Sequence, residues 1–242
     1  RRNYALAGFD PEAMTVIPTG LPAAYLLPRP GAADGPPARP GGARALAYVG
    51  RLSPEKGLEV AIRALALLTR ERVGQDVTLD VIGSGNAVYR GRLEGLVERL
   101  VLDGKVRFVG KVGHDDMIER YARYDALLFP SLWAEPFGRS VVEAMARGVP
   151  VVATRRGGPA EIIADGQTGL LVPPGDPEAM AGAVVRLLTR PALWRGIRQA
   201  ALERVRRDYV LDGTIARVEA YLASVVERAG AVPAPRGIPC AS

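Results

Sequence analysis

From residue 45 onward, short apolar runs of strand length alternate with longer segments whose apolar residues recur at helical spacing. The expected strands are 45–49, 78–82, 106–108, 126–129, 151–153 and 169–172. The expected helices are 58–68, 88–100, 117–124, 140–146 and 180–188. Strands that are apolar on both faces and alternate with helices form a parallel sheet covered on both sides. Right-handed crossovers then predict a doubly wound, Rossmann-like α/β domain.

The segments that flank this regular pattern differ from it in composition. Residues 1–28 are interpreted as the end of a preceding unit, and residues 29–44, rich in Pro, Gly and Ala, as a linker or loop. The regular domain is expected over 45–190, followed by C-terminal helices within 191–229 and a disordered tail over 230–242. Because position 1 is Arg rather than Met, we expect the chain to be a fragment.

Charge and composition indicate which kinds of ligand or partner the chain is expected to bind. The net charge is +6, but only 6% of the residues are aromatic and no nucleic-acid-reading motif is present, so nucleic acid is not expected. A small anionic ligand is expected, with peripheral contact at the inner face of a membrane as an alternative. The lone Cys240 cannot form a disulfide or a cysteine metal site within one chain, which suits the cytoplasm.

The loop after the first expected strand carries two cations where a helix is expected to begin. It reads Gly50-Arg51-Leu52-Ser53-Pro54-Glu55-Lys56-Gly57, in which Ser53 and Pro54 are suited to open a helix. A helix N-terminus disfavours nearby cations by about 0.3–1 kcal/mol. Arg51 and Lys56 therefore make sense there if they share an anion such as phosphate, and solvated charges are the alternative.

The loop after the fourth expected strand carries two glutamates, Glu135 and Glu143, with seven residues between them. Glu143 falls inside the following helix, and its side chain leans back toward the helix N-terminus. A carboxylate close to a phosphate would be repelled. Both glutamates are therefore expected to accept hydrogen bonds from neutral hydroxyls of a ligand that has phosphates at the helix start and polyol groups on either side. Ordinary surface glutamates are the alternative.

These loops resemble those of a known enzyme family. Residues 135–143 resemble the E-x7-E motif of retaining glycosyltransferases with the two-Rossmann GT-B fold, and residues 50–57 resemble their phosphate-binding loop. Further stretches are similar to family 4, also called glycosyltransferase group 1, and occur in the family's order: 81–85, 106–110, 148–154, 157–158 and 165–169. The resemblance covers about 45–190 and implies the C-terminal, donor-binding half of the GT-B fold.

Carried over position by position, the resemblance implies a role for each matching residue. Arg51 and Lys56 would bind the donor diphosphate and stabilise charge on the leaving nucleotide, Glu135 would hold the donor sugar, and Glu143 the ribose hydroxyls. The backbone around these side chains would complete the site: Gly50 in the phosphate loop, Phe137 and Gly138 at the sugar, Arg139 and Ser140 at the phosphate, and Lys111 and Val112 at the base.

The implied reaction is transfer of a sugar, with retention, from a UDP- or GDP-sugar to an acceptor that the sequence does not identify. We expect no cofactor and no metal, because two cations and a helix N-terminus can neutralise the departing diphosphate. The N-terminal Rossmann domain of the family is missing here, so the chain alone is expected to bind donor weakly and to transfer nothing. Two alternatives are a non-catalytic nucleotide-sugar-binding module and a fragment of a GT-B-fold sugar epimerase.

Three further features have structural interpretations. Gly83-Ser84-Gly85 lacks the third glycine of a dinucleotide fingerprint and is expected to form a strand-to-helix turn. Asp115 and Asp116 are expected at a helix N-terminus rather than on a metal. His114, the only histidine, is expected to cap that helix or to contact solvent.

Overall fold

The chain folds around a six-stranded sheet in which every pairing is parallel. The computed structural model describes residues 8, 10, 12, 14–26, 42–71 and 76–230. Its strands are β1 (Arg44–Val49), β2 (Val77–Ile82), β3 (Val106–Gly110), β4 (Ala126–Phe129), β5 (Val151–Thr154) and β6 (Leu170–Val172). They lie in the order β3-β2-β1-β4-β5-β6. This order reverses between β1 and β4, so the predicted doubly wound, Rossmann-like fold is confirmed.

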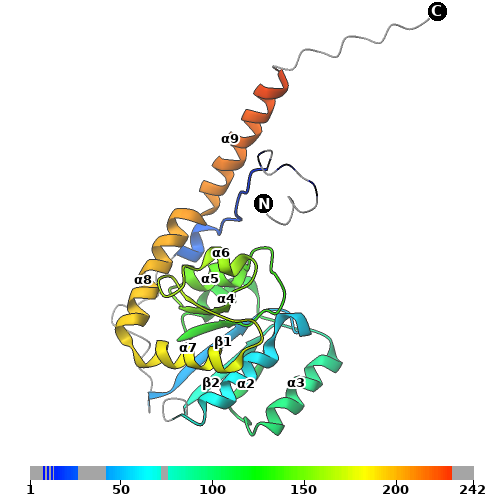
Figure 1. The fold of residues 1–242 in the computed structure, drawn as a ribbon, viewed down its shortest axis with the longest axis vertical. Helices are drawn as coiled ribbons and strands as arrows, with labels where there is room; N and C mark the ends of the chain where they lie inside the picture. Colours follow the sequence, from blue (N-terminus) through cyan, green and yellow to red (C-terminus); the bar gives the residue numbers. More distant parts are fainter. Residues whose placement is uncertain are drawn as a thin grey trace, which may run out of the picture.

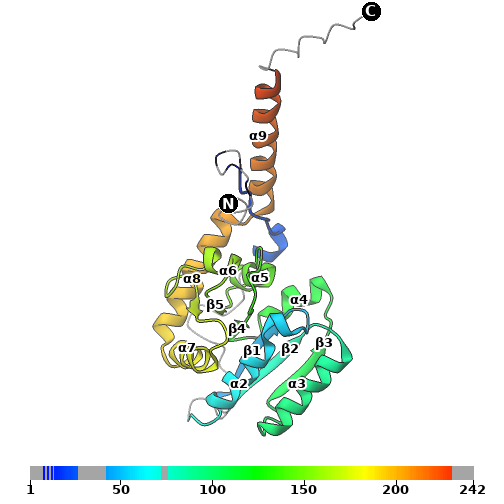
Figure 2. The ribbon, with the colours of Figure 1, turned by 45° about the vertical axis from the view of Figure 1, so that its right-hand side comes forward.

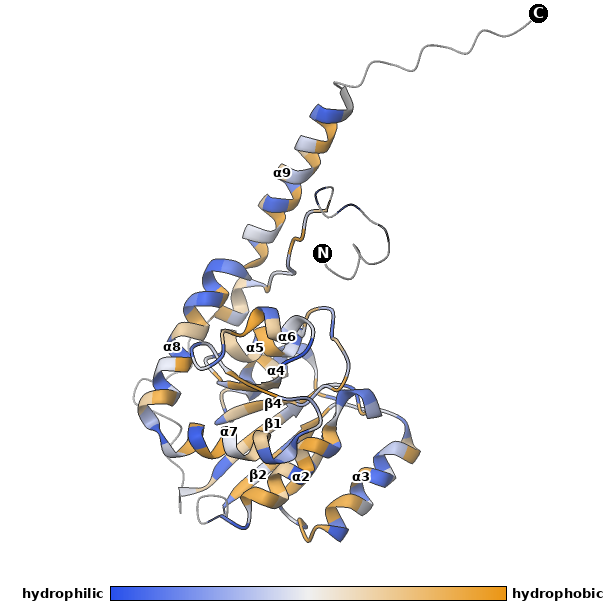
Figure 3. Ribbon diagram, viewed as in Figure 1, coloured by the Kyte–Doolittle hydropathy of each residue, from blue (hydrophilic) through white to orange (hydrophobic). Residues whose placement is uncertain are grey.

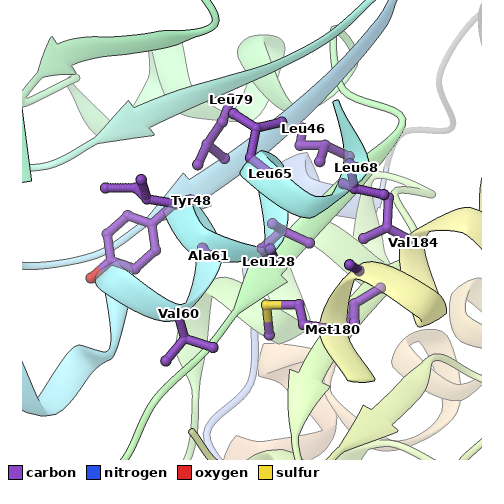
Figure 4. Packing of buried hydrophobic residues seen from close by; sticks show 14 of the residues in the cluster. Leu46, Tyr48, Val60, Ala61, Leu65, Leu68, Leu79, Leu128, Met180 and Val184 are labelled. Atoms are coloured by element: carbon purple, nitrogen blue, oxygen red, sulfur yellow. The ribbon is translucent and has the colours of Figure 1, made fainter. Parts of the chain in front are cut away.

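Helices cover both faces of this sheet (Figures 1 and 2). On one face lie α2 (Leu58–Leu68), α3 (Ala87–Arg99) and α7 (Pro177–Thr189); on the other lie α4 (His114–Tyr121), α5 (Arg139–Ala146) and α6 (Gly158–Ile162). Strand side chains alternate between the two layers, so Leu46 and Tyr48 pack under α2 while Ala47 faces the opposite layer. Figure 4 shows the first of these cores, where side chains of β1, β2 and β4 meet α2 and α7.

Several helix boundaries differ from the expectation by up to three residues. The helix expected over 117–124 is α4, which begins at His114 and ends at Tyr121. Its first turn holds Asp115 and Asp116, which confirms them at a helix N-terminus, where acidic side chains are favourable. After β1, a short 3-10 helix, η4 (Pro54–Lys56), precedes α2, because Gly57 has a φ of 68° and interrupts the helical backbone. The short helix α6 was not predicted.

The N-terminal segment packs against the C-terminal end of the chain. The Leu21 N–H donates to the Tyr209 carbonyl at 2.8 Å, and the Leu211 N–H donates to the Leu21 carbonyl at 2.9 Å. The 3-10 helix η2 (Ala23–Leu26) then places Tyr25 in the core beneath α5. Part of the segment predicted to end a preceding unit is therefore anchored to this domain. Most of the predicted linker over 29–44 and the tail after residue 230, with Cys240, lie outside the described residues.

Two helices complete the fold. Helix α8 (Pro191–Asp208) adds Trp194 to the core of the α2 layer and Val205 to that of the α5 layer. Helix α9 (Leu211–Gly230) projects from the body (Figures 1 and 2), and apolar residues follow one side of it (Figure 3). These side chains are 37% to 71% exposed: Leu211, Ile215, Val218, Leu222, Val225 and Val226. Among the described residues, no helix has the length and apolar character that crossing a membrane requires.

Candidate functional site

The loops that follow β1 and β4 meet at the carboxyl ends of the strands, where the strand order reverses. Ligands of doubly wound sheets bind at this position. A cavity of about 360 Å³ lies there. Its walls include the predicted residues Gly50, Lys56, Glu135, Gly138, Arg139, Ser140 and Glu143, together with Tyr48 and Ser131. Most of the residues that the motifs single out therefore surround one space.

A second cavity, of about 550 Å³, shares Val49 and Gly50 with the first. It is lined by the predicted residues Arg51, Lys111 and Val112 and by the turn Gly83-Ser84-Gly85, which connects β2 to α3 as expected. Arg51 and Lys56 thus line neighbouring cavities rather than one. The Arg51 side chain is 67% exposed and its Nη2 donates to Glu55 Oε1 at 3.1 Å. The structure therefore does not pair the two cations as the loop sequence suggested.

Phe137 is the predicted residue whose side chain lies away from both cavities. It lines a third cavity of about 230 Å³, together with residues 16–19, and its ring is 5.9 Å from that of Tyr209. The sequence-based role concerned only the backbone of Phe137. The side chain instead anchors the loop after β4 to the end of α8.

Glu135 is held by one cation and one hydroxyl. It is only 7% exposed, and its Oε1 accepts hydrogen bonds from Lys56 Nζ and, at 3.0 Å, from Ser131 Oγ. A carboxylate this buried needs such partners to offset the loss of hydration. Lys56 and Glu135 come from the loops after β1 and β4, so their ion pair joins the two loops across the floor of the first cavity.

Glu143 is held in a similar way, with one partner on each oxygen. It is 7% exposed; its Oε1 accepts from Arg139 Nε at 2.8 Å and its Oε2 from the Tyr121 hydroxyl at 3.1 Å. Burial, and then the nearby Glu143 charge, raise the pKa of Tyr121 well above its ordinary value, so the phenol remains a donor. The hydrogen bond to Glu143 likewise raises the pKa of Arg139.

Lys56 and Arg139 were predicted site residues, but their ion pairs with the two glutamates were not predicted. The carboxylates were expected to accept from neutral hydroxyls of a ligand, whereas each is paired with a cation and a protein hydroxyl. Arg139 and Glu143 are four residues apart on α5, a spacing that places side chains side by side and could have indicated the pair. The positive charges offset the negative ones, which weakens the repulsion that a phosphate would meet.

His114 links this network to the N-terminal segment. Its ring is exposed, as expected, but it also lies 5.0 Å from the ring of Tyr25, whose hydroxyl is 2.9 Å from Nδ1 and 2.6 Å from Nε2. Arg139 Nη2 is 3.4 Å from His114 Nε2. Burial raises the pKa of Tyr25 to about 12. No sequence motif indicated that Tyr25 would lie beside the site.

The loop after β4 is in backbone contact with its neighbours on both sides. The Leu132 N–H donates to the Glu55 carbonyl at 2.8 Å, and the Gly158 N–H donates to the Glu135 carbonyl at 2.7 Å. These approaches need glycine: a Cβ on Gly57 would lie 2.1 Å from the Pro130 oxygen, and one on Gly158 would lie 2.1 Å from the Phe137 oxygen. The loop that carries Glu135 is thus enclosed by the loops after β1 and β5.

We expect Gly158→Ala to lower the free energy of unfolding by about 1–3 kcal/mol, because its Cβ would collide with a backbone oxygen that cannot move alone. Urea denaturation followed by circular dichroism measures this loss. Gly182→Ala is the control, since nothing lies within 4 Å of the added Cβ and alanine is favourable inside α7. Equal stability of the Gly158 variant and the wild type would show that the loops do not need this contact.

Comparison with protein families shows which family the chain belongs to. Residues 34–204, well over half of its length, match the family described as glycosyl transferases group 1. The chain belongs to the group 1 glycosyltransferases. The cavities lined by residues of its motifs are therefore the candidate active-site region of a group 1 domain.

Relatives of this group 1 chain extend well beyond the part that it covers. It is 34% identical over 228 residues to glycogen synthase of Mycobacterium tuberculosis, which covers 92% of this chain and 51% of that protein. It is also 34% identical to D-inositol 3-phosphate glycosyltransferase of Kineococcus radiotolerans, covering 95% of this chain and 56% of that protein. The chain thus spans about half the length of these relatives.

Solved structures support the same fold for this group 1 chain. The crystal structure of Anabaena Alr3699/HepE in complex with UDP-glucose superposes with a TM-score of 0.79 and 26% identity, covering 92% of this chain and 61% of that one. The arrangement of the six-stranded sheet and its helices matches that of GT-B glycosyltransferases, which confirms the predicted fold class.

Proposed function

We propose that this chain is the nucleotide-sugar-binding half of a retaining, metal-independent glycosyltransferase of family 4. The observation that carries the proposal is the cavity at the strand-order reversal, in which buried Glu135 and Glu143 lie on either side of the N-terminus of α5. A helix N-terminus attracts phosphate, and carboxylates accept hydrogen bonds from sugar hydroxyls. A nucleoside-diphosphate sugar has both kinds of group, in the order that the cavity requires.

In this proposal, each part of the donor binds to a different set of residues. The diphosphate lies at the amides of Arg139 and Ser140 with Lys56 beside it, the ribose lies at Glu143, and the transferred sugar lies at Glu135 near the backbone of Gly138. The base enters the second cavity near Lys111 and Val112, and Arg51 lies at the boundary between the base and the diphosphate. Gly50, shared by both cavities, lies where the two parts of the donor join.

Charge stabilisation is the chemical task of these residues. As the bond between sugar and phosphate breaks, negative charge grows on the departing nucleotide. In this proposal the charge is stabilised by Lys56, Arg51 and the N-terminus of α5, so the reaction needs neither a metal nor a cofactor. A UDP-sugar is the favoured donor, since the similar Anabaena protein binds UDP-glucose, and a GDP-sugar is the alternative.

The acceptor site belongs to the part of the enzyme that these residues do not include. The relatives are about twice as long as the matched region, which supports a second domain that binds the acceptor beside this one. We therefore propose that the 242 residues bind donor but transfer no hexose alone. A cytoplasmic location, with peripheral membrane contact as its alternative, remains a prediction.

The test is the affinity for UDP of the Glu143→Ala variant, measured by calorimetry. Loss of the hydrogen bonds to the ribose is expected to weaken binding by about 1–3 kcal/mol. Glu94→Ala is the control, because Glu94 lies on α3, pairs with Arg90 across the helix surface and lines neither cavity. If both variants bind UDP as the wild type does, Glu143 does not contact the nucleotide and the proposed function fails.

A further inference from the structure

We propose that Tyr121 is a positioning residue that orients Glu143 for a cis-diol, so that the chain prefers ribonucleotides to 2′-deoxyribonucleotides. The proposal rests on the proposed function, in which Glu143 holds the ribose. It adds a residue from another helix, α4, that contacts no ligand itself and acts only through the carboxylate.

The two partners of Glu143 differ in how firmly they can hold it. Arg139 lies at the mouth of the cavity with more than half of its side chain exposed, and its Nη2 lies 3.4 Å from Nε2 of the exposed His114 ring. Tyr121 is fully buried between α4 and the sheet, and its ring is fixed by the surrounding core. Within the described part of the chain, Glu143 is the only hydrogen-bond partner of the Tyr121 hydroxyl. Tyr121 is therefore the fixed partner and Arg139 the exchangeable one.

The distribution of hydrogen bonds over the carboxylate determines what it can still accept. An ionised carboxylate has two acceptor sites on each oxygen. Arg139 occupies one site on Oε1 and Tyr121 occupies one on Oε2. One site remains on each oxygen, which matches two neighbouring hydroxyls that each donate to one oxygen. Ribose presents such a pair, and 2′-deoxyribose does not.

Without Tyr121, the same carboxylate has a competing arrangement. Arginine binds carboxylates through two parallel hydrogen bonds when both oxygens are accessible. At present Oε2 is engaged by Tyr121, so Arg139 donates to Oε1 alone. Removal of the phenolic hydroxyl would release Oε2 to Arg139 and turn the carboxylate away from the diol. The hydroxyl of Tyr121 thus keeps the two ribose-facing sites available.

The experiment compares two tyrosines on the same side of the sheet. Tyr124 is also buried and donates to a carboxylate, Asp80 Oδ2, at 2.8 Å, but Asp80 lines neither cavity. Dissociation constants for UDP and 2′-deoxy-UDP are measured for the 242-residue chain and for its Tyr121→Phe and Tyr124→Phe variants. The wild type and Tyr124→Phe are expected to prefer UDP by about tenfold. Tyr121→Phe is expected to prefer it by less than about threefold, and a retained tenfold preference would overturn the proposal.

The same measurements separate this proposal from the one on which it rests. If the wild type binds both nucleotides equally, or if Glu143→Gln keeps the preference, the proposed function and the role of Tyr121 fail together. If Glu143→Gln abolishes the preference and Tyr121→Phe does not, only the role of Tyr121 fails. Should Tyr121→Phe not fold, 4-aminophenylalanine at position 121 must keep the preference and 4-methylphenylalanine, which has no donor, must lose it.

Discussion

Replacing Trp194 by alanine is expected to lower the free energy of unfolding by about 3–5 kcal/mol, the loss typical of a large aromatic side chain removed from a core. The Trp194 side chain is completely buried in the core shared by α2 and α7, and its Nε1 donates to the Asp125 carbonyl at 2.9 Å. The alanine would leave a void and would remove the hydrogen bond that the indole donates to a buried carbonyl. Urea denaturation followed by circular dichroism gives the loss directly.

The second tryptophan is the control for this experiment. Trp133, in the loop after β4, is 45% exposed. Trp133→Ala should therefore change the free energy of unfolding by less than about 1 kcal/mol, as surface substitutions usually do. If Trp194→Ala also lowers the free energy of unfolding by less than about 1 kcal/mol, α8 does not depend on Trp194 for its attachment to the sheet.

Lys56→Met is expected to have two large effects, one on stability and one on binding. Glu135 would remain buried without its cation, which should lower the free energy of unfolding by about 2–4 kcal/mol, slightly less than for a fully buried pair because Lys56 is partly exposed. The variant should also bind UDP at least about tenfold more weakly, since it would lose the charged hydrogen bond that we propose between Lys56 and the diphosphate. Denaturation and calorimetry measure the two effects separately.

A double variant separates the two roles of Lys56. In Lys56→Met with Glu135→Gln, the uncompensated charge is gone, so most of the lost stability should return while the affinity for UDP stays low. If the double variant also regains the wild-type affinity, the role of Lys56 is to neutralise Glu135 rather than to bind the diphosphate. The same result would remove Lys56 from the proposed site.

Strands could be predicted well from the sequence because their physical signal is local. The run 126–129 matches β4 at both ends, since four consecutive apolar residues are typical of a strand buried on both faces. The paired charges inside the sheet could not be predicted. Asp80 is buried in β2 because Arg107, on the neighbouring strand β3, donates to its two oxygens at 2.9 and 2.7 Å. That pairing depends on the register of the two strands, which no local pattern contains.

The candidate site, too, was predicted in part. The sequence identified the loops and most of the residues that line the first cavity, because a parallel sheet brings the loops at its carboxyl edge together. It did not separate Arg51 from Lys56, because the left-handed conformation of Gly57 and the short helix η4 determine where each side chain points. It also did not identify Tyr121, which is 22 residues from Glu143 and reaches it because α4 and α5 share one core on the same face of the sheet.

The backbone contacts around the loop after β4 have a consequence for the thermodynamics of binding. Glycines at positions 57 and 158 allow the neighbouring loops to enclose the segment that carries Glu135. The entropy lost in ordering this segment is therefore lost when the chain folds, not when a donor arrives. A donor then meets a preorganised surface, so more of the free energy of its contacts with this loop remains as affinity.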